Sequence, residues 1–308
     1  MPRMARLKVR GDEAWYHLCA RVAGRKGDYP LEDKACQRKL VDLLRHFTKA
    51  YFCDVAGFAV MGNHYHLVIR FHRPRKVDQK ELERRAARLY PRSAKLLRGW
   101  SSEQWARLEA RLFDLSELMR NLQAAFARWF NRTHERRGRF WAERFKSTLL
   151  EDGQAVLDAV LYVDLNAVRA GLVARPEEHE GSSCFARHEG AGWLVKLSEL
   201  VGKPKGALRE YRYLLYHRGN VPSKEGQGSI PDSVLEAEAA RGYESRGAYS
   251  RRLRYFADGV ALGSEGFVLG VLGGLRDSGR YIRRKNPVPQ PAGTLVSLRE
   301  QRSHAIAF

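Results

Sequence analysis

The chain has 308 residues, in which 55 lysines and arginines against 35 aspartates and glutamates give a formal net charge of +20. This excess favours a polyanionic partner such as a nucleic acid, bound with a strong dependence on salt but without sequence preference. A hydrophobic content of 44% is ordinary for a globular protein with its own core, and the sequence has no apolar run of about 18 residues that would predict a membrane-spanning helix.

The hydrophobic periodicity predicts seven elements, of which four are strands and three are helices. In chain order these are a strand near 14–22, a helix near 32–50, strands near 53–61 and 64–71, a helix near 115–133, a strand near 140–149 and a helix over 151–171. This order predicts an α+β fold with a ferredoxin-like or RRM-like antiparallel sheet and helices on one face.

Two further regions stand outside this pattern. The connection from 72 to 114 is longer than such a fold requires, and its mixture of charges and leucines predicts a helical insertion. After the first 180 residues, which we take as one domain, residues 181–280 are expected to form a mostly helical accessory region. The final segment, 281–308, contains a KNPVPQP run and is predicted to be disordered.

Two histidines lie one residue apart in the segment VMGNHYHLVI at 60–69, which is apolar and β-branched and is therefore predicted to be a strand. Because side chains at i and i+2 of a strand project from the same face, His64 and His66 would present two imidazoles side by side. Tyr65, Leu67 and Ile69 form the opposite, apolar row. We therefore expect the histidines on the open face of the sheet, although two surface histidines on a strand also arise by chance.

The helix predicted over 151–171 carries an apolar stripe and, on its flank, a polar row at i, i+4, i+8 and i+11. The polar row consists of Asp158, Tyr162, Asn166 and Arg169. Taken alone, a tyrosine at the margin of a core and an asparagine near a helix end need no function. Beside two imidazoles, however, an amide oxygen can complete the ligands of a divalent cation, and a phenol can act as a nucleophile on phosphorus.

On these residues the chain resembles the single-tyrosine transposases of the HUH endonuclease superfamily, especially the REP-associated tyrosine transposases and their insertion-sequence relatives. The resemblance covers roughly residues 10–180 and rests on VMGNHYHLVI at 60–69, LMRNLQAAFARWFNRTHERRGRFWAERFKS at 118–147 and YVDLNAVRAGLV at 162–173. Relatives often have a proline after the asparagine, where this chain has Ala167.

The resemblance implies that His64 and His66 are metal ligands, that Asn166 is the third ligand, and that Tyr162 attacks DNA. The tyrosine would become linked to a 5′-phosphate and release a 3′-hydroxyl. The resemblance further implies Mg or Mn as the cofactor, single-stranded or hairpin-forming repeat DNA as the partner, a bacterial, nucleoid-associated location, and a monomer or homodimer. The accessory region would then help to recognise a DNA hairpin.

Several basic residues are candidates for contacts with the DNA backbone. Arginines and lysines interleave with aromatic residues between 136 and 146, a mixture that single-stranded nucleic acids bind through phosphate contacts and base stacking. Others lie on the predicted helical insertion, where a merely solvated helix is an equal alternative. The candidates are Arg144 and Lys146, which share a strand face, then Arg136 and Arg137, and on the insertion Arg84, Arg85 and Arg88, together with Arg92 and Lys95.

Two alternative functions remain open from the sequence. The first is a domesticated DNA- or RNA-binding regulator on the same scaffold, and the second is a hydrolytic nuclease in which water attacks and Tyr162 only packs. The absence of a GxxxxGK[ST] phosphate loop predicts no nucleotide cofactor and no fused helicase motor. Four cysteines without close spacing favour reduced thiols over disulfides or a zinc cluster, and with no secretory signal evident we expect a cytoplasmic protein. The cysteines are Cys19, Cys36, Cys53 and Cys184.

Overall fold

The computed structural model describes residues 7–9, 11–25, 27–91, 96–222, 226–240, 259–278, 288–289 and 295–299. Two of the basic residues named above, Arg92 and Lys95, lie outside these ranges. None of the described helices is both long enough and apolar enough to cross a membrane.

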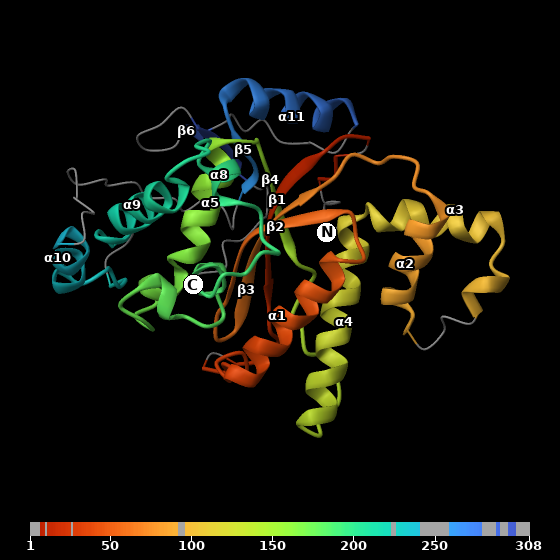
Figure 1. The fold of residues 1–308 in the computed structure, drawn as a ribbon, viewed down its shortest axis with the longest axis horizontal. Coiled ribbons are helices and arrows are strands. Elements are labelled where there is room, and N and C mark those ends of the chain that lie inside the picture. The colour runs from red at the N-terminus through yellow and green to blue at the C-terminus, as the bar shows by residue number, and fades with distance from the viewer. Residues whose placement is uncertain are drawn as a thin grey trace.

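A four-stranded antiparallel unit forms the centre of the molecule (Figure 1). Its elements follow the predicted order, and its strands lie in the order β2-β3-β1-β4, as in a ferredoxin-like sheet. The α+β fold class is therefore confirmed. The elements are β1 (Ala14–Arg21), α1 (Lys34–Thr48), β2 (Cys53–Val60), β3 (His64–Phe71), α4 (Leu115–Thr133) and β4 (Lys146–Leu150).

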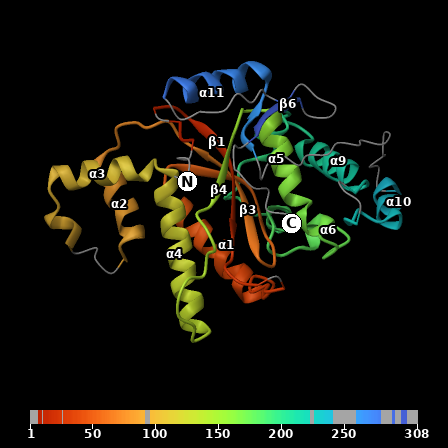
Figure 2. The same ribbon diagram turned by 180° about the vertical axis from the view of Figure 1, so that it is seen from behind.

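The sheet buries both of its faces, because each strand carries apolar residues on either side. Leu18 and Leu67 face α1 and α4, whereas Trp15 and Val68 face the helix α5 (Gln154–Asp164). Figures 1 and 2 show α1 and α4 on one side of the sheet and α5 on the other. The two helices of the ferredoxin-like core share one face as expected, but the expectation that the second face is open is wrong.

The helix α5 packs closely on this second face, where the side chain of Val160 approaches the backbone of Gly57 in β2. The ladder between β2 and β3 shifts register between Val55 and Gly57, and a Cβ built on Gly57 would lie 3.3 Å from Cγ1 of Val160 on α5. A side chain at position 57 would therefore require Val160 to shift.

The predicted helical insertion is confirmed as α2 (Gln79–Leu89), a short 3-10 turn (Leu96–Gly99) and α3 (Ser102–Leu112). Asp78 caps the first turn of α2, and Ser101 and Gln104 form a capping box at the start of α3. The insertion packs beside α1 and α4, on the opposite side of the sheet from α5.

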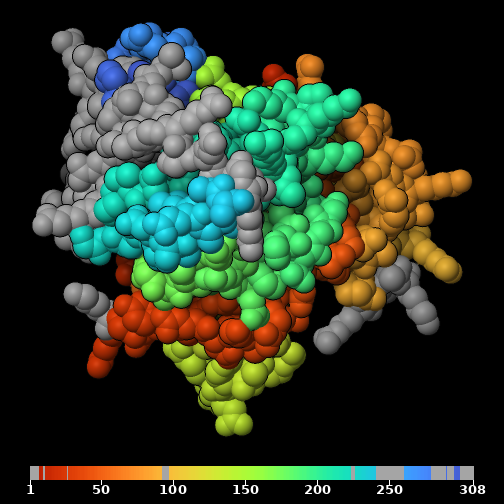
Figure 3. Space-filling view, turned by 60° about the vertical axis from the view of Figure 1, so that its left-hand side comes forward, coloured from red at the N-terminus to blue at the C-terminus, as the bar shows by residue number. Residues whose placement is uncertain are grey.

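The C-terminal part of the chain covers α5 and also lengthens the sheet. Figure 3 shows the segment from α5 to α10, in green to cyan, lying against the N-terminal segment in red. Its helices are α6 (Asn166–Arg169), α7 (Ser183–His188), α8 (Leu197–Leu200), α9 (Ala207–Gly219), α10 (Asp232–Ala240) and α11 (Glu265–Asp277), with a 3-10 turn at Pro176–Glu178.

Three strands extend the sheet beyond β4 to give the order β2-β3-β1-β4-β5-β7-β6. They are β5 (Gly259–Gly263), which pairs in parallel with β4, β6 (Val288–Pro289) and β7 (Val296–Arg299). Two of them fall within the segment predicted to be a disordered tail. The expectation fails there because Val296 and Leu298 are buried in the same core as Leu18.

One residue at the end of α4 has a strained backbone. The N–H of Arg136 donates to the carbonyl of Asn131 (2.8 Å), which closes a Schellman motif with Glu135 at the left-handed position. Glu135 has φ +50° and is the only non-glycine residue with positive φ in the described ranges.

Replacing this residue with glycine should stabilise the protein. Glycine avoids the steric penalty of roughly 1–2 kcal/mol that other residues incur in the left-handed conformation, but part of this gain is lost because glycine raises the entropy of the unfolded chain. The free energy of unfolding of Glu135→Gly should therefore exceed that of Glu135→Ala by about 1 kcal/mol. Urea unfolding of the two variants measures this difference, and the alanine variant controls for loss of the charge. Equal midpoints would contradict the assigned turn.

Candidate functional site

The cross-strand register places the two predicted histidines in a longer polar row on the α5 face. His66 lies opposite Cys19 of β1, and Cys19 lies opposite Lys146 of β4. His64 lies opposite Arg21, and His17 is two residues before Cys19 on the same face. The structure therefore brings a third histidine, which the sequence analysis did not select, beside the predicted pair.

The three imidazoles and the phenol of Tyr162 form one group of aromatic rings. His17 stacks on His66 with ring centroids 5.1 Å apart, and His64 meets His66 edge to face at 5.0 Å. The ring of Tyr162 lies edge to face against His66 at 5.7 Å and against His17 at 6.1 Å. The residues predicted from two separate motifs are thus in contact within a single chain.

Each predicted ligand histidine has its Nδ1 engaged by a neighbouring side chain. Nδ1 of His66 lies 2.9 Å from Nε2 of His17, and Nδ1 of His64 lies 2.8 Å from Oδ1 of Asn63. In the tautomers in which both Nδ1 atoms donate, each Nε2 keeps its lone pair. Metal-ligating histidines are commonly oriented by such a bond from the other ring nitrogen.

Burial keeps these imidazoles neutral, which is the form that binds metals. Desolvation, with a smaller contribution from Arg21, lowers the pKa of His64 to about 4. Desolvation also lowers the pKa of His66 well below its usual value, and the neighbouring His64 and His17 act in the same direction. His66 is 4% exposed, so the histidine face is covered rather than open.

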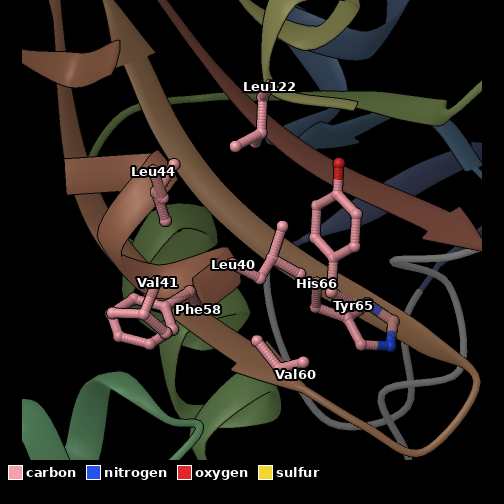
Figure 4. A pocket seen from close by; sticks show the side chains of 8 residues that line it. All are labelled: Leu40, Val41, Leu44, Phe58, Val60, Tyr65, His66 and Leu122. Carbon is pink, nitrogen blue, oxygen red and sulfur yellow. The ribbon is translucent and has the colours of Figure 1, made fainter. Parts of the chain in front are cut away.

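Figure 4 shows how the alternation of β3 separates its two faces. The side chains of Tyr65 and His66 leave the strand in opposite directions, and Tyr65 borders a cavity of about 10 Å³ against α1. A cavity of this size holds one water molecule at most, so the α1 face is packed core.

The helix that carries Tyr162 ends earlier than predicted. The helix expected over 151–171 is divided at Leu165 into α5 and α6, and Asn166 begins the second piece. Nδ2 of Asn166 donates to the carbonyls of Tyr162 (3.1 Å) and Val163 (3.3 Å). Because Nδ2 faces these two carbonyls, Oδ1 is the amide atom that a cation would bind.

A buried arginine lies beside the tyrosine. The guanidinium carbon of Arg169 lies 5.4 Å from the centroid of the Tyr162 ring, and Nε of Arg169 has no hydrogen-bond partner among the described residues. Burial, with Arg218 acting in the same direction, lowers the pKa of Arg169 to about 10, so the group stays charged at neutral pH.

Two buried carboxylates fix α5 to the C-terminal helices. Asp158 accepts a hydrogen bond from Nη2 of Arg218 on α9 (2.5 Å). Asp164 accepts from the Ser183 hydroxyl (2.5 Å), from the Cys184 N–H (3.1 Å) and from the Tyr211 hydroxyl. Both carboxylates belong to the tyrosine helix, so its position depends on partners that lie far along the chain.

The structure places the predicted DNA-contacting residues in different settings. Lys146 shares a cross-strand row with His66, and the exposed residues include Arg144, Arg136, Arg137, Arg84 and Arg88. Arg85 is engaged internally, because it pairs with Glu81 (2.8 Å), donates to the Tyr51 carbonyl (3.0 Å) and lies over the Phe52 ring. Arg85 therefore serves the packing of the insertion rather than an exposed surface.

Three residues of the site were not selected from the sequence, namely His17, Arg21 and Arg169. His17 and Arg21 alternate with Cys19 on a strand, but nothing in that pattern shows that β1 lies next to β3. Arg169 stands in the polar row of Tyr162, and its spacing alone does not show whether it is solvated or buried.

Comparisons with known proteins give a partial structural likeness. No protein-family model matches the chain, and no curated protein matches it. Among solved structures, the chain is similar to a REP-associated tyrosine transposase bound to a REP hairpin, with a TM-score of 0.41 and 13% sequence identity. The match covers 63% of this chain and 89% of the other.

Removing the carboxylate of Asp164 should strongly destabilise the fold. Asp164→Ala leaves the buried Arg187 without its ion-pair partner at 3.8 Å and the Tyr211 hydroxyl without its acceptor, which should cost about 3–5 kcal/mol. Urea unfolding provides the measurement. Asp42→Ala, on the exposed side of α1, is the matched control and should change stability by less than about 0.5 kcal/mol. Similar losses in both variants would contradict the assigned role of Asp164.

Proposed function

We propose that this protein is a metal-dependent single-stranded DNA endonuclease and strand transferase that uses Tyr162 as its nucleophile. The observation that carries the proposal is the contact of the Tyr162 ring with His66, whose ring in turn meets His64. The resemblance of the motifs at 60–69 and 162–173 to single-tyrosine transposases supports the same assignment.

The donor atoms are of the kinds that bind a divalent cation. His64 and His66 each offer Nε2 because their Nδ1 atoms are engaged by Asn63 and His17, and Asn166 offers Oδ1 because its amide nitrogen is engaged by the helix backbone. Two imidazoles and an amide oxygen accept Mg or Mn and leave positions for phosphate oxygens. When bound, such a cation would polarise the scissile phosphate and neutralise its charge.

The chain's own residues account for the covalent step. A phenol has a pKa near ~10, and the guanidinium of Arg169 lies over the ring of Tyr162. The Tyr162 oxygen then attacks phosphorus, the bond from phosphorus to the 3′-oxygen breaks, and that oxygen leaves as a hydroxyl after taking a proton from solvent. Because the phosphotyrosine keeps the energy of the phosphodiester, a 3′-hydroxyl can reverse the step without an external energy source.

The positive residues around the site would hold the substrate. Arg21 and Lys146 flank the histidines on β1 and β4, and the net charge of +20 favours a polyanion. Hairpin-forming repeat DNA is the proposed substrate class, with contacts from Arg136, Arg137 and Arg144, which are exposed on the segment before β4.

The first test is a covalent adduct on a denaturing gel. Wild-type protein with Mn or Mg and single-stranded DNA containing repeat hairpins should give a protease-sensitive band that carries the fragment on the 3′ side of the cut, joined through its 5′-phosphate. Tyr162→Phe should reduce this band by at least about 10³-fold, because the variant lacks the phenolic oxygen that forms the ester in the proposed step. Tyr90→Phe, on the insertion, is the control and should behave as wild type.

The remaining outcomes separate the alternatives. Cleavage without an adduct would show that water attacks, which favours a hydrolytic nuclease. Tight binding with no cleavage, across repeats and metals, would favour a DNA- or RNA-binding regulator in which the positive charge alone supplies affinity.

Metal removal tests the assigned ligands separately from DNA binding. Chelation should abolish the adduct, and adding Mg or Mn back should restore it in the wild type but not in His66→Ala. The affinity for DNA, measured by fluorescence anisotropy at fixed salt, should change by less than about 3-fold in His66→Ala, because the charged residues supply most of the binding. Full activity in the presence of chelator would contradict the assignment.

Mixing two inactive variants tests whether the site is assembled within one chain. Tyr162 contacts the histidines of its own chain, and α5 is fixed by α7 and α9. A mixture of His66→Ala and Tyr162→Phe should therefore form no adduct. Recovery to about one quarter of wild-type activity would instead show an exchange of tyrosine helices between two chains.

A further inference from the structure

We propose that Asp33, Cys36 and His134 form a second metal site, separate from the histidines of the proposed active site, that binds a zinc-class ion. Among the described His, Cys, Asp and Glu residues, these three form the one group whose ligand atoms all lie within 4.8 Å of one another. The inference does not depend on the proposed function, because none of the three residues takes part in the chemistry assigned to Tyr162.

The spacing of the ligand atoms fits a single tetrahedral ion. Sγ of Cys36 lies 3.8 Å from Oδ2 of Asp33. Zinc bonds of about 2.3 Å to sulfur and about 2.0 Å to oxygen, at a tetrahedral angle, place these two atoms about 3.5 Å apart. A movement of a few tenths of an ångström, within the freedom of two side chains, would close the site around the ion.

The aspartate and the histidine are already oriented for this role. Oδ1 of Asp33 accepts from the N–H of Ala35 as the N-cap of α1, which leaves Oδ2 for the ion. Nδ1 of His134 donates to the carbonyl of Phe130 (2.9 Å), and the imidazole stacks on the Phe130 ring with centroids 4.0 Å apart. The remaining nitrogen, Nε2, is thus held in a fixed direction with its lone pair available.

The donor set determines the class of ion. One thiolate, one imidazole and one carboxylate are the ligands that select Zn²⁺, whereas Mg²⁺ and Mn²⁺ prefer sites made mainly of oxygen. Three protein ligands leave a fourth position for water. The proposed active site, with two imidazoles and an amide oxygen, lacks sulfur, so the two sites should differ in their preferred metal.

The ion would fasten two helices that meet at one end of the molecule. Asp33 and Cys36 belong to the start of α1 and His134 follows the end of α4, and Figures 1 and 2 show both helix ends at the same end of the structure. The chain then continues through Arg136 and Arg137 towards β4. A zinc ion here would stabilise the start of this positively charged segment as well as the contact between α1 and α4.

The test uses Co²⁺ as a spectroscopic substitute for Zn²⁺ in the full-length protein. Wild type should bind Co²⁺ with the near-ultraviolet absorption band of a thiolate ligand. Cys36→Ala should lose the band, and Asp33→Asn and His134→Gln should weaken Co²⁺ binding by at least about 10-fold. Asp33→Asn is the decisive variant for a folded protein, because asparagine is an equally good N-cap but a poorer ligand.

Two controls separate this site from the proposed active site. His66→Ala should keep the thiolate band, and saturating Zn²⁺ should raise the melting temperature of the wild type by more than that of Cys36→Ala. Absence of the band in the wild type would overturn the proposal, as would a band that persists in Cys36→Ala and disappears in Cys19→Ala. Unchanged affinity in both Asp33→Asn and His134→Gln would overturn it as well.

Discussion

The packing of α5 against the second face of the sheet is the constraint on which the candidate site depends. Gly57 permits this packing because its missing Cβ leaves room for Val160. The contact lays the ring of Tyr162 over the histidine row and removes His17 and His66 from water. On a sheet with an open face, the same row would be an ordinary solvated surface.

This packing buries ionisable groups, and the two carboxylates of α5 are matched by donors on the C-terminal helices. Asp164 gathers donors from α7 and α9 and lies 3.8 Å from Arg187, while Asp158 pairs with Arg218. The imidazoles remain neutral because burial disfavours their charged form. The guanidinium of Arg169 lies over the ring of Tyr162 at 5.4 Å from its centroid. The C-terminal helices are therefore part of the electrostatics of the site and not merely an appendage.

The two proposed cation sites use opposite faces of the sheet and different chemistry. One combines imidazoles with an amide oxygen under α5, where coordination positions are needed for a phosphate. The other combines a thiolate, an imidazole and a carboxylate between α1 and α4, where the proposed ion would hold the two helices together. Separation of this kind allows a labile Mg or Mn and a tightly held zinc to occupy one chain, because ligand softness directs each ion to its own donors.

The sequence by itself determined the order and type of the core elements, because periodicity and capping are local properties: α4 spans the residues that its apolar stripe predicted, and β3 presents His64 and His66 on one face. It also pointed to Tyr162 and Asn166 through their spacing. Only the tertiary structure decided that β1 places His17 beside His66, that Arg85 turns inward and that Val296 and Leu298 complete the sheet. Strand neighbours and buried charges depend on contacts between residues far apart in the chain, and no local pattern specifies which distant surface will cover a polar row.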